Sequence, residues 1–345
     1  MASNSSVDAT QGIERLLECL QAPLFTAKKG KPVEVPAPLA PLADTHGHLT
    51  PLRHIDPAVA IARASMVGVR LLAVPVDPAD DVPDVSAFLS WFDEVLRTAH
   101  ELIACTQEYP QYVPGDGGDP LCLEPLPNNT FFLAGVHPYG AQRFMEDPSV
   151  RVRLLELLDH DLCKGVGEFG LDYGPWNKLP SDVQVAAFRE HLRIAHERNL
   201  PVELHIRDAD GDFGAQAHVD ALRVLREEGV PAAGCDLHCF TSGPEVMTPF
   251  VELGCHVAFG GAVTFARSED IRVAAQACPA NKILSETDSP YMAPVPLRGQ
   301  KCEPAMVAFS AACVAQVREV AGAATQAQTY ADLWHNACGF FGIAN

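Results

Sequence analysis

The stretch "ADTHGHLTP" (43–51) places His46 and His48 behind Asp44 at the end of a short apolar run. Side chains alternate between the two faces of a β-strand, so these three polar residues share one face. The stretch alone leaves two interpretations open, the start of a metal site or a strand end with polar side chains. It is not the glycine-rich phosphate loop that usually follows the first strand of a doubly wound open sheet.

Short apolar runs alternate with longer helical patterns after this stretch. Strands are expected at residues 43–46, 70–76, 131–137, 165–171, 201–206, 235–240, 256–262 and 282–288. Helices are expected at residues 57–66, 85–104, 148–160, 181–198, 216–228, 244–253, 268–277 and 303–319. This alternation predicts parallel strands with helical crossovers, and eight units within about 250 residues match an α/β fold of the TIM (β/α)8 barrel type. A doubly wound open sheet is the alternative.

The composition limits the classes of function. Of the 345 residues, 48% are hydrophobic and 20% are charged, as in globular proteins with a large core. The formal net charge of −19 argues against binding along a long nucleic acid, because such binding depends on Lys and Arg neutralising phosphates. We expect a cytoplasmic protein, with the nucleus as the alternative, because neither a membrane-spanning run nor a secretory signal pattern is visible. Eleven cysteines at irregular spacings suit reduced thiols.

The chain is interpreted as an N-terminal extension over residues 1–40 and a single barrel domain over residues 41–345. The stretch "KKGKPVEVPAPLAPLA" (28–43) begins in the extension and runs into the barrel domain, and its prolines predict an extended lead-in. Residues 105–130 are rich in Pro and Gly and too long for an ordinary barrel loop. They are predicted to be an insertion, either a functional excursion or a mobile segment.

Metal-ligand side chains gather at the predicted strand ends, where barrel enzymes place their active sites. They are His46, His48, Glu168, His205, His238 and Asp288. Four histidines and two carboxylates suit Zn²⁺, Mg²⁺, Mn²⁺ or Co²⁺ and exceed the needs of one tetrahedral site, which implies two divalent ions. Paired ions about 3.5–4 Å apart can activate a water and stabilise a displacement at phosphorus. Glu168 is the natural bridge, and Asp288 could bind one ion while accepting a proton from the attacking water.

Each residue also has a plainer interpretation. A single histidine at a strand end is more often structural than a ligand, but six ligand-type residues at five strand ends are harder to explain that way. Cys235 and Cys239 flank His238 at odd offsets and are expected to point away from it, which argues against a Cys/His zinc knuckle. Three histidines in predicted helices are interpreted as surface or packing residues, namely His191, His196 and His218.

With these residues assembled, the chain resembles the TatD family of metal-dependent hydrolases, an amidohydrolase-like group of barrels. The matching stretches are "DTHGHL" (44–49), "AGVHPYG" (134–140), "GVGEFGLDYG" (165–174), "LPVELHIRDA" (200–209), "DLHCFTSG" (236–243), "GGAVTF" (260–265) and "ETDSPYMAP" (286–294). The resemblance covers residues 40–345. It implies a TIM barrel with a divalent-metal site and hydrolysis of phosphodiester bonds in DNA, typically from the 3′ end of single strands. Its metal ligands fall on the same six residues.

The resemblance also suggests substrate contacts. His137 in "GVHP" is expected near the scissile phosphate or in a loop-structuring role. Arg207 and Arg298 are candidates to bind phosphate, since a guanidinium matches its geometry, or to form ion pairs at the barrel rim. Glu203 and Glu286 are expected one layer deeper, either orienting the ligand histidines or forming structural ion pairs.

Three departures from the family pattern bear on the substrate. An acidic residue usually stands at the position of Thr50 and an Asn at the position of Cys302, and the insertion at 105–130 is longer than usual. None of them removes a ligand. Thr50 is therefore the place to look for an altered choice of substrate.

The main hypothesis is a metal-dependent 3′-to-5′ exonuclease acting on the ends of single-stranded DNA, with RNA as a further candidate substrate and no obligate protein partner. In this hypothesis Glu168 bridges the ions and Asp288 helps to generate the nucleophile. A second hypothesis is hydrolysis of another ester or amide, for example an aminoacyl-tRNA. A third is a catalytically silent barrel that acts as a binding scaffold, which would be expected to have lost at least one ligand.

Overall fold

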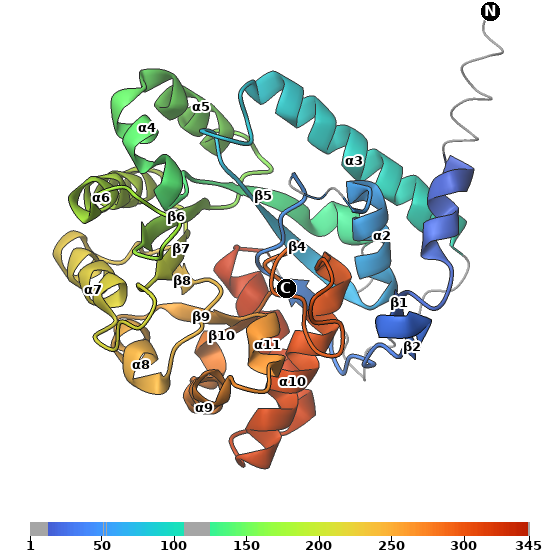
Figure 1. The fold of residues 1–345 in the computed structure, drawn as a ribbon. Helices are drawn as coiled ribbons and strands as arrows, with labels where there is room; N and C mark the ends of the chain where they lie inside the picture. Colours follow the sequence, from blue (N-terminus) through green and yellow to red (C-terminus); the bar gives the residue numbers. More distant parts are fainter. Residues whose placement is uncertain (1–12, 51, 53, 107–124, 344–345) are drawn as a thin grey trace, which may run out of the picture.

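Parallel strands and surrounding helices form a barrel in the part of the chain that the structure describes (Figure 1). The structure is a computed structural model that describes residues 13–50, 52, 54–106 and 125–343. Its barrel strands are β3 (Leu42–Asp44), β4 (Val69–Val76), β5 (Thr130–Ala134), β6 (Val166–Asp172), β7 (Val202–Arg207), β8 (Cys235–Leu237), β9 (His256–Phe259) and β10 (Ile283–Ser285). They pair in parallel as the sheets β3-β4-β5 and β6-β7-β8-β9-β10.

Backbone hydrogen bonds join these two sheets at both edges. Between β5 and β6, the amide of Lys164 donates to the carbonyl of Phe132 over 3.0 Å. Beyond β3 and β10, the amide of Asp288 donates to the carbonyl of His46 over 2.9 Å. The sheet therefore closes on itself, which confirms the predicted TIM barrel and excludes the open doubly wound sheet.

The helices form a ring around the strands in Figure 1. They are α2 (Pro57–Met66), α3 (Val85–Cys105), α4 (Ala141–Glu146), α5 (Pro148–Leu158), α6 (Ser181–Arg198), α7 (Gln216–Glu228), α8 (Pro244–Glu252), α9 (Glu269–Ala277), α10 (Val307–Val320) and α11 (Gln326–Phe340). Local signals explain several starts. The side chain of Asp56 accepts the amide of Ala58 and caps α2, whose first residue is Pro57. Among the described residues, no helix is both long and apolar enough to cross a membrane.

The sequence analysis did not predict α4 or α11. The last helix packs across the amino-terminal end of the barrel, where Trp334 and Phe341 join a buried cluster that includes Phe131 of β5 and Leu284 of β10. The rings of Phe131 and Phe341 lie 4.8 Å apart between centroids in an edge-to-face arrangement. This helix therefore closes the barrel floor, opposite the end at which the candidate ligands lie.

The two unusual segments are described in part. Residues 13–40 contain a short hairpin of β1 (Phe25–Thr26) and β2 (Pro32–Val33) rather than an entirely extended lead-in, and Phe25 packs edge-on to Phe309 of α10. Of the predicted insertion at 105–130, residues 107–124 lie outside the described residues. Its remaining ends belong to α3, to a 3₁₀ turn at Leu126–Asn129 and to β5.

Candidate metal centre

The six predicted ligands come together at the carboxyl end of the barrel. His46 and His48 follow β3, Glu168 lies in β6 and His205 in β7, while His238 and Asp288 follow β8 and β10. All six are buried or nearly so. Since parallel barrel strands bring their carboxyl ends to one face, the alternation of elements alone places these residues near one another.

Glu168 lies at the middle of the cluster. Its Oε1 atom is 3.3 Å from His48 Nε2 and 3.7 Å from His46 Nε2. Its Oε2 atom is 3.0 Å from His238 Nε2 and 3.2 Å from His205 Nδ1. Each oxygen of one carboxylate thus faces a separate pair of histidines.

Asp288 lies beside the pair formed by His46 and His48. Its Oδ1 atom lies 3.8 Å from His46 Nε2 and 3.9 Å from His48 Nε2, and these two nitrogens are 3.1 Å apart. The face of the His46 ring stacks on the ring of His238 with 3.9 Å between centroids.

Buried carboxylates stand behind two of the histidines. Glu203 Oε2 lies 2.8 Å from His46 Nδ1, and Glu286 Oε2 lies 3.7 Å from His238 Nδ1. Glu286 also accepts the amide of Cys239 through Oε1 over 2.6 Å. A carboxylate at one ring nitrogen directs the lone pair of the other nitrogen toward the centre, which is the usual arrangement around metal-binding histidines. Glu203 is therefore within hydrogen-bond distance of the histidine that it would orient, whereas Glu286 lies near His238 but beyond that distance.

The donor set fits a divalent cation. With Glu203 at Nδ1 of His46, the Nε2 lone pair faces His48 Nε2 and the oxygens of Glu168 and Asp288. Electron-rich atoms packed this closely repel one another unless protons or a cation lie between them. Imidazole nitrogens and carboxylate oxygens are ligands that Zn²⁺, Mn²⁺ and Co²⁺ share. The residues present are thus sufficient to hold metal.

The two central carboxylates differ in proton affinity. Burial raises the pKa of Glu168, but the charges of His238 and His46 outweigh burial and hold it well below the usual range. Burial raises the pKa of Asp288 to about 6, against the opposing influence of His238 and His48. Asp288 is therefore the carboxylate that takes up a proton more readily.

Asp44 does not contact the histidine rings directly. Its two oxygens accept the amide of Thr287 over 2.8 Å and the hydroxyl of Thr287 over 2.7 Å. Since Thr287 precedes Asp288, this buried aspartate ties the end of β3 to the segment after β10. It fixes backbone near the centre rather than a ring.

Asp172 is a residue that the sequence analysis missed. Its Oδ2 atom lies 3.2 Å from His205 Nε2, and its Oδ1 atom accepts the amide of Gly174 over 2.7 Å. It lies four residues after Glu168 on the same strand, so the period of two that selected the other residues could have found it. With His137 and His205 it forms a further group whose ligand-type atoms lie within 4.8 Å of one another.

Cys239 corrects one prediction. It was expected to point away from the histidine face, but β8 ends at Leu237 and Cys239 has a φ of 47°, so strand alternation does not extend to it. Burial, and then the nearby Asp288, raise the pKa of its thiol well above the usual range. Cys235 does face away: it is a free, fully buried thiol in the apolar core near Cys255, so a Cys/His zinc knuckle is not formed.

The predicted substrate residues lie at different distances from this centre. His137 accepts the amide of Tyr139 and packs its ring edge-on to His205 at 4.4 Å, so it structures its loop and also borders the cluster. Arg207 ends β7 and lies 3.9 Å from Asp210. Arg298 stacks over the ring of Phe265 at 4.1 Å, at the rim.

The helical histidines behave as predicted. His191 is fully buried, where its Nδ1 donates to the carbonyl of Ala187 and its Nε2 accepts the amide of Val136. His218 is buried against Asp208, and His196 is exposed. None of these three belongs to the candidate centre as the described residues form it.

Comparison with known proteins agrees with this architecture. A family described as TatD related DNase matches residues 43–342. The uncharacterized metal-dependent hydrolase YcfH of Escherichia coli K12 is 39% identical over 196 residues, which cover 56% of this chain and 68% of that protein. The 3′-5′ ssDNA/RNA exonuclease TatD of Rahnella is 32% identical over 169 residues, 49% of this chain and 60% of that protein.

A solved structure supports the fold. YjjV, a TatD homologue of E. coli K12, superposes with a TM-score of 0.65 at 21% identity, covering 89% of this chain and all of that one. Together with the match over residues 43–342 and the relative at 39% identity, these findings show that the chain belongs to the TatD family of metal-dependent hydrolases.

Proposed function

We propose that the protein is a divalent-metal-dependent deoxyribonuclease that removes nucleotides from the 3′ end of single-stranded DNA. One observation carries this proposal: the two oxygens of Glu168 each face a separate histidine pair, as expected of a carboxylate that bridges two ions. The matched family is named for DNase activity, and the Rahnella relative is named as an exonuclease on single-stranded DNA and RNA. RNA is therefore a further candidate substrate.

In this proposal the residues on each side of the cluster would hold one divalent ion. The ligands would be His46, His48 and Asp288 on one side and His205 and His238 on the other, with Glu168 between them. Mg²⁺, Zn²⁺, Mn²⁺ and Co²⁺ are the candidates. The chemistry that two such ions supply when bound is Lewis acidity, which activates a water and polarises a phosphoryl oxygen.

The remaining steps fall to side chains of the chain itself. Asp288 accepts the proton of the attacking water, a role that its raised proton affinity suits. Glu203 orients the ring of His46, and Glu286 lies behind the ring of His238. Arg207, at the end of a barrel strand, would bind a substrate phosphate in this proposal.

His137 and Arg298 are two further candidates for contacts with the substrate. His137 borders His205 and would lie near the scissile phosphate. Arg298 lies at the rim, where it would meet a phosphate farther along the strand. Neither is required for holding an ion.

The charge of the chain favours a terminal substrate. A net charge of −19 opposes binding along many phosphates, whereas an exonuclease holds one end of the strand. The same charge suits a small ester or amide, such as an aminoacyl ester, which is the second candidate. A silent scaffold is disfavoured because the six candidate ligands are all present and lie together.

The decisive experiment combines metal analysis with cleavage of labelled strands. Purified protein is assayed for bound metal and then incubated with 3′- and 5′-labelled single-stranded oligonucleotides and with an aminoacyl ester. We expect bound divalent metal and stepwise loss from the 3′ end. Glu168→Gln should abolish cleavage, whereas Glu156→Gln, an exposed change on α5, should not. Cleavage of the ester alone, or full activity in Glu168→Gln, would refute the proposal.

A further inference from the structure

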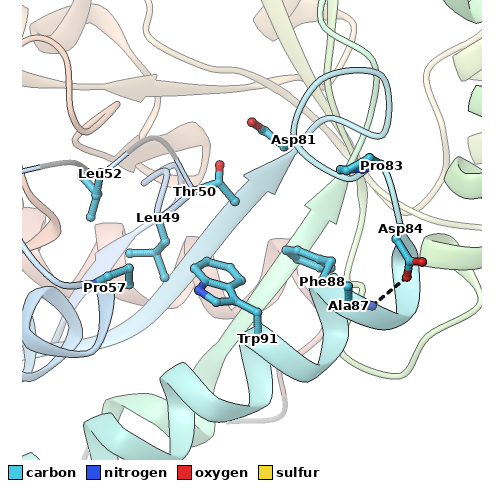
Figure 2. A pocket seen from close by; sticks show the side chains of 10 residues that line it. All are labelled: Leu49, Thr50, Leu52, Pro57, Asp81, Pro83, Asp84, Ala87, Phe88 and Trp91. Atoms are coloured by element: carbon cyan, nitrogen blue, oxygen red, sulfur yellow. Dashed lines mark hydrogen bonds between the residues drawn. The ribbon is translucent and has the colours of Figure 1, made fainter. Parts of the chain in front are cut away.

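A cavity of about 400 Å³ opens beside the candidate centre (Figure 2). It lies between the segment after β3, the start of α2, the loop after β4 and the first turns of α3. Leu49 and Thr50 on its wall directly follow His48. Because consecutive Cα atoms are about 3.8 Å apart, the Cα atom of Thr50 lies within about 7.6 Å of that of His48.

One wall of the cavity is apolar and partly aromatic. Leu49 is fully buried, Phe88 is buried, and the indole of Trp91 extends from α3 toward Leu49 in Figure 2. The rings of Phe88 and Trp91 lie 5.8 Å apart between centroids. Such a wall suits a flat ring, since aromatic side chains bind nucleobases through their faces.

The other wall is acidic. Asp81 and Asp84 line it, and both are exposed to solvent. Asp84 also caps α3 by accepting the amide of Ala87 over 2.8 Å. Two carboxylates repel a phosphate, but they accept hydrogen bonds from amino groups, as Asp and Glu do from the exocyclic amine of cytosine.

We infer that this cavity binds the base of the substrate's terminal nucleotide and prefers the amino-bearing bases adenine, cytosine and guanine over thymine. The base lies against Trp91, its exocyclic amine donates to Asp81 or Asp84, and its phosphate points away from these carboxylates toward the centre. The cavity volume of about 400 Å³ is large enough for a nucleobase, since pockets that bind small molecules begin at about 300 Å³. This inference rests on the proposed function, because it identifies the part of the substrate that the neighbouring cavity would bind.

Binding is tested first without cleavage. The metal-loaded Trp176→Phe variant keeps Trp91 and the buried Trp334 as fluorophores. It is titrated with adenosine, cytidine, thymidine and, as an amine without a base, agmatine. We expect saturable quenching by adenosine and cytidine, about tenfold weaker quenching by thymidine, and loss of that preference in Asp81→Ala/Asp84→Ser, in which Ser keeps the helix cap. Quenching by agmatine but not by nucleosides would overturn the inference.

Cleavage then tests the cavity against the proposed function. Oligonucleotides ending in adenine, thymine or an abasic residue are compared by KM and kcat. We expect the abasic end to raise KM about 5- to 150-fold, as the loss of one stacked base does, and Trp91→Leu to erase this difference. Cleavage that ignores the terminal base, together with no quenching, would refute the cavity assignment and leave the nuclease intact. Quenching without any cleavage would support the cavity and refute the nuclease.

Discussion

The Nδ1 atom of His46 lies 2.8 Å from the Oε2 atom of Glu203, and both side chains are buried. Removing this carboxylate frees the ring and leaves its Nδ1 without a partner. We expect Glu203→Ala to weaken divalent-ion binding by about 10- to 100-fold, the usual effect of losing such a supporting group. Calorimetric titration of metal-free protein with Mn²⁺ or Zn²⁺ measures the change.

A matched control separates this effect from a general loss of charge. Glu197→Ala removes an exposed glutamate of α6 and should leave the affinity unchanged. Glu203→Gln keeps an acceptor and should retain most of the affinity. If Glu203→Ala binds ions as tightly as the wild type, Glu203 does not position His46.

Gly170 permits β6 and β7 to approach each other next to His205. A Cβ atom at this position would lie 2.0 Å from the carbonyl oxygen of His205, and the backbone φ is +153°. Because that oxygen belongs to a paired strand, it cannot move without shifting β7. We expect Gly170→Ala to destabilise the protein by at least about 1–3 kcal/mol and to weaken metal binding.

Denaturant unfolding and metal titration check this prediction together. Gly211→Ala is the control, because Gly211 also has a positive φ, of +79°, but has nothing within 4 Å of its would-be Cβ atom. That control should cost about 1 kcal/mol through backbone strain and should not affect metal binding. Equal losses in the two variants would show that crowding at His205 is unimportant.

His191 makes stability depend on pH. Burial lowers its pKa to about 4 from a normal value of 6.5, so the unfolded chain binds the extra proton first as the pH falls. The neutral His191 ring therefore contributes its full share of the unfolding free energy above about pH 6.5. About 3 kcal/mol of this free energy is lost as the pH falls from about 6.5 to about 4. We expect the difference in unfolding free energy between wild type and His191→Gln to shrink by this amount from pH 7 to pH 4. A constant difference would show that His191 does not titrate as a buried base.

The barrel and most of the centre could be predicted because both follow from chain periodicity. Alternating strands and helices indicate a closed parallel sheet, and parallel strands bring their carboxyl ends together, so Glu168 and His238 could be assigned to one site from the sequence. Their separation by only 3.0 Å, and the division of histidines between the two oxygens of Glu168, needed the structure.

Other features depend on contacts that periodicity does not report. The side chain of Cys239 faces Asp288 because the chain leaves β8 with a positive φ, and a pattern of alternation ends where the strand ends. The helix that carries Trp334 closes the barrel floor by packing against residues far away in sequence. No strand follows this helix among the described residues, so the strand–helix alternation did not indicate it. Asp172 was overlooked although its position on the strand of Glu168 indicated it.

Ion binding should stabilise the fold. The centre gathers Glu168 and Asp288 with four histidines, and a cation that binds the folded state alone adds about 2.7 kcal/mol when its concentration is 100 times its Kd. We expect chelation to lower the melting temperature and added Mn²⁺ or Zn²⁺ to restore it. Glu168→Gln should reduce this response, whereas Glu156→Gln should keep it in full. A melting temperature that stays the same after chelation and after addition of ions would contradict the assignment of these six residues as a metal centre.

The ion pair between Arg63 of α2 and Glu303 ties the amino-terminal segment to the barrel. Arg63 Nη2 lies 2.7 Å from Glu303 Oε1, with the two side chains only 12% and 4% exposed, and Arg63 also donates to the carbonyls of Cys19 and Leu24. We expect Arg63→Ala to cost about 3–5 kcal/mol, because it leaves a buried carboxylate unpaired, and to speed amide hydrogen exchange over residues 18–33.

A double-mutant cycle tests the pair itself. Arg63→Met/Glu303→Leu should lose less stability than the sum of the single changes, since it buries no unpaired charge. Arg97→Ala, which breaks the exposed pairs of α3, is the control and should change stability little, because water and salt screen exposed charges. Glu303→Leu alone keeps the bonds from Arg63 to Cys19 and Leu24, so exchange over residues 18–33 should rise less than in Arg63→Ala. Equal exchange in both variants would mean that the carboxylate, rather than these carbonyl contacts, holds the segment in place.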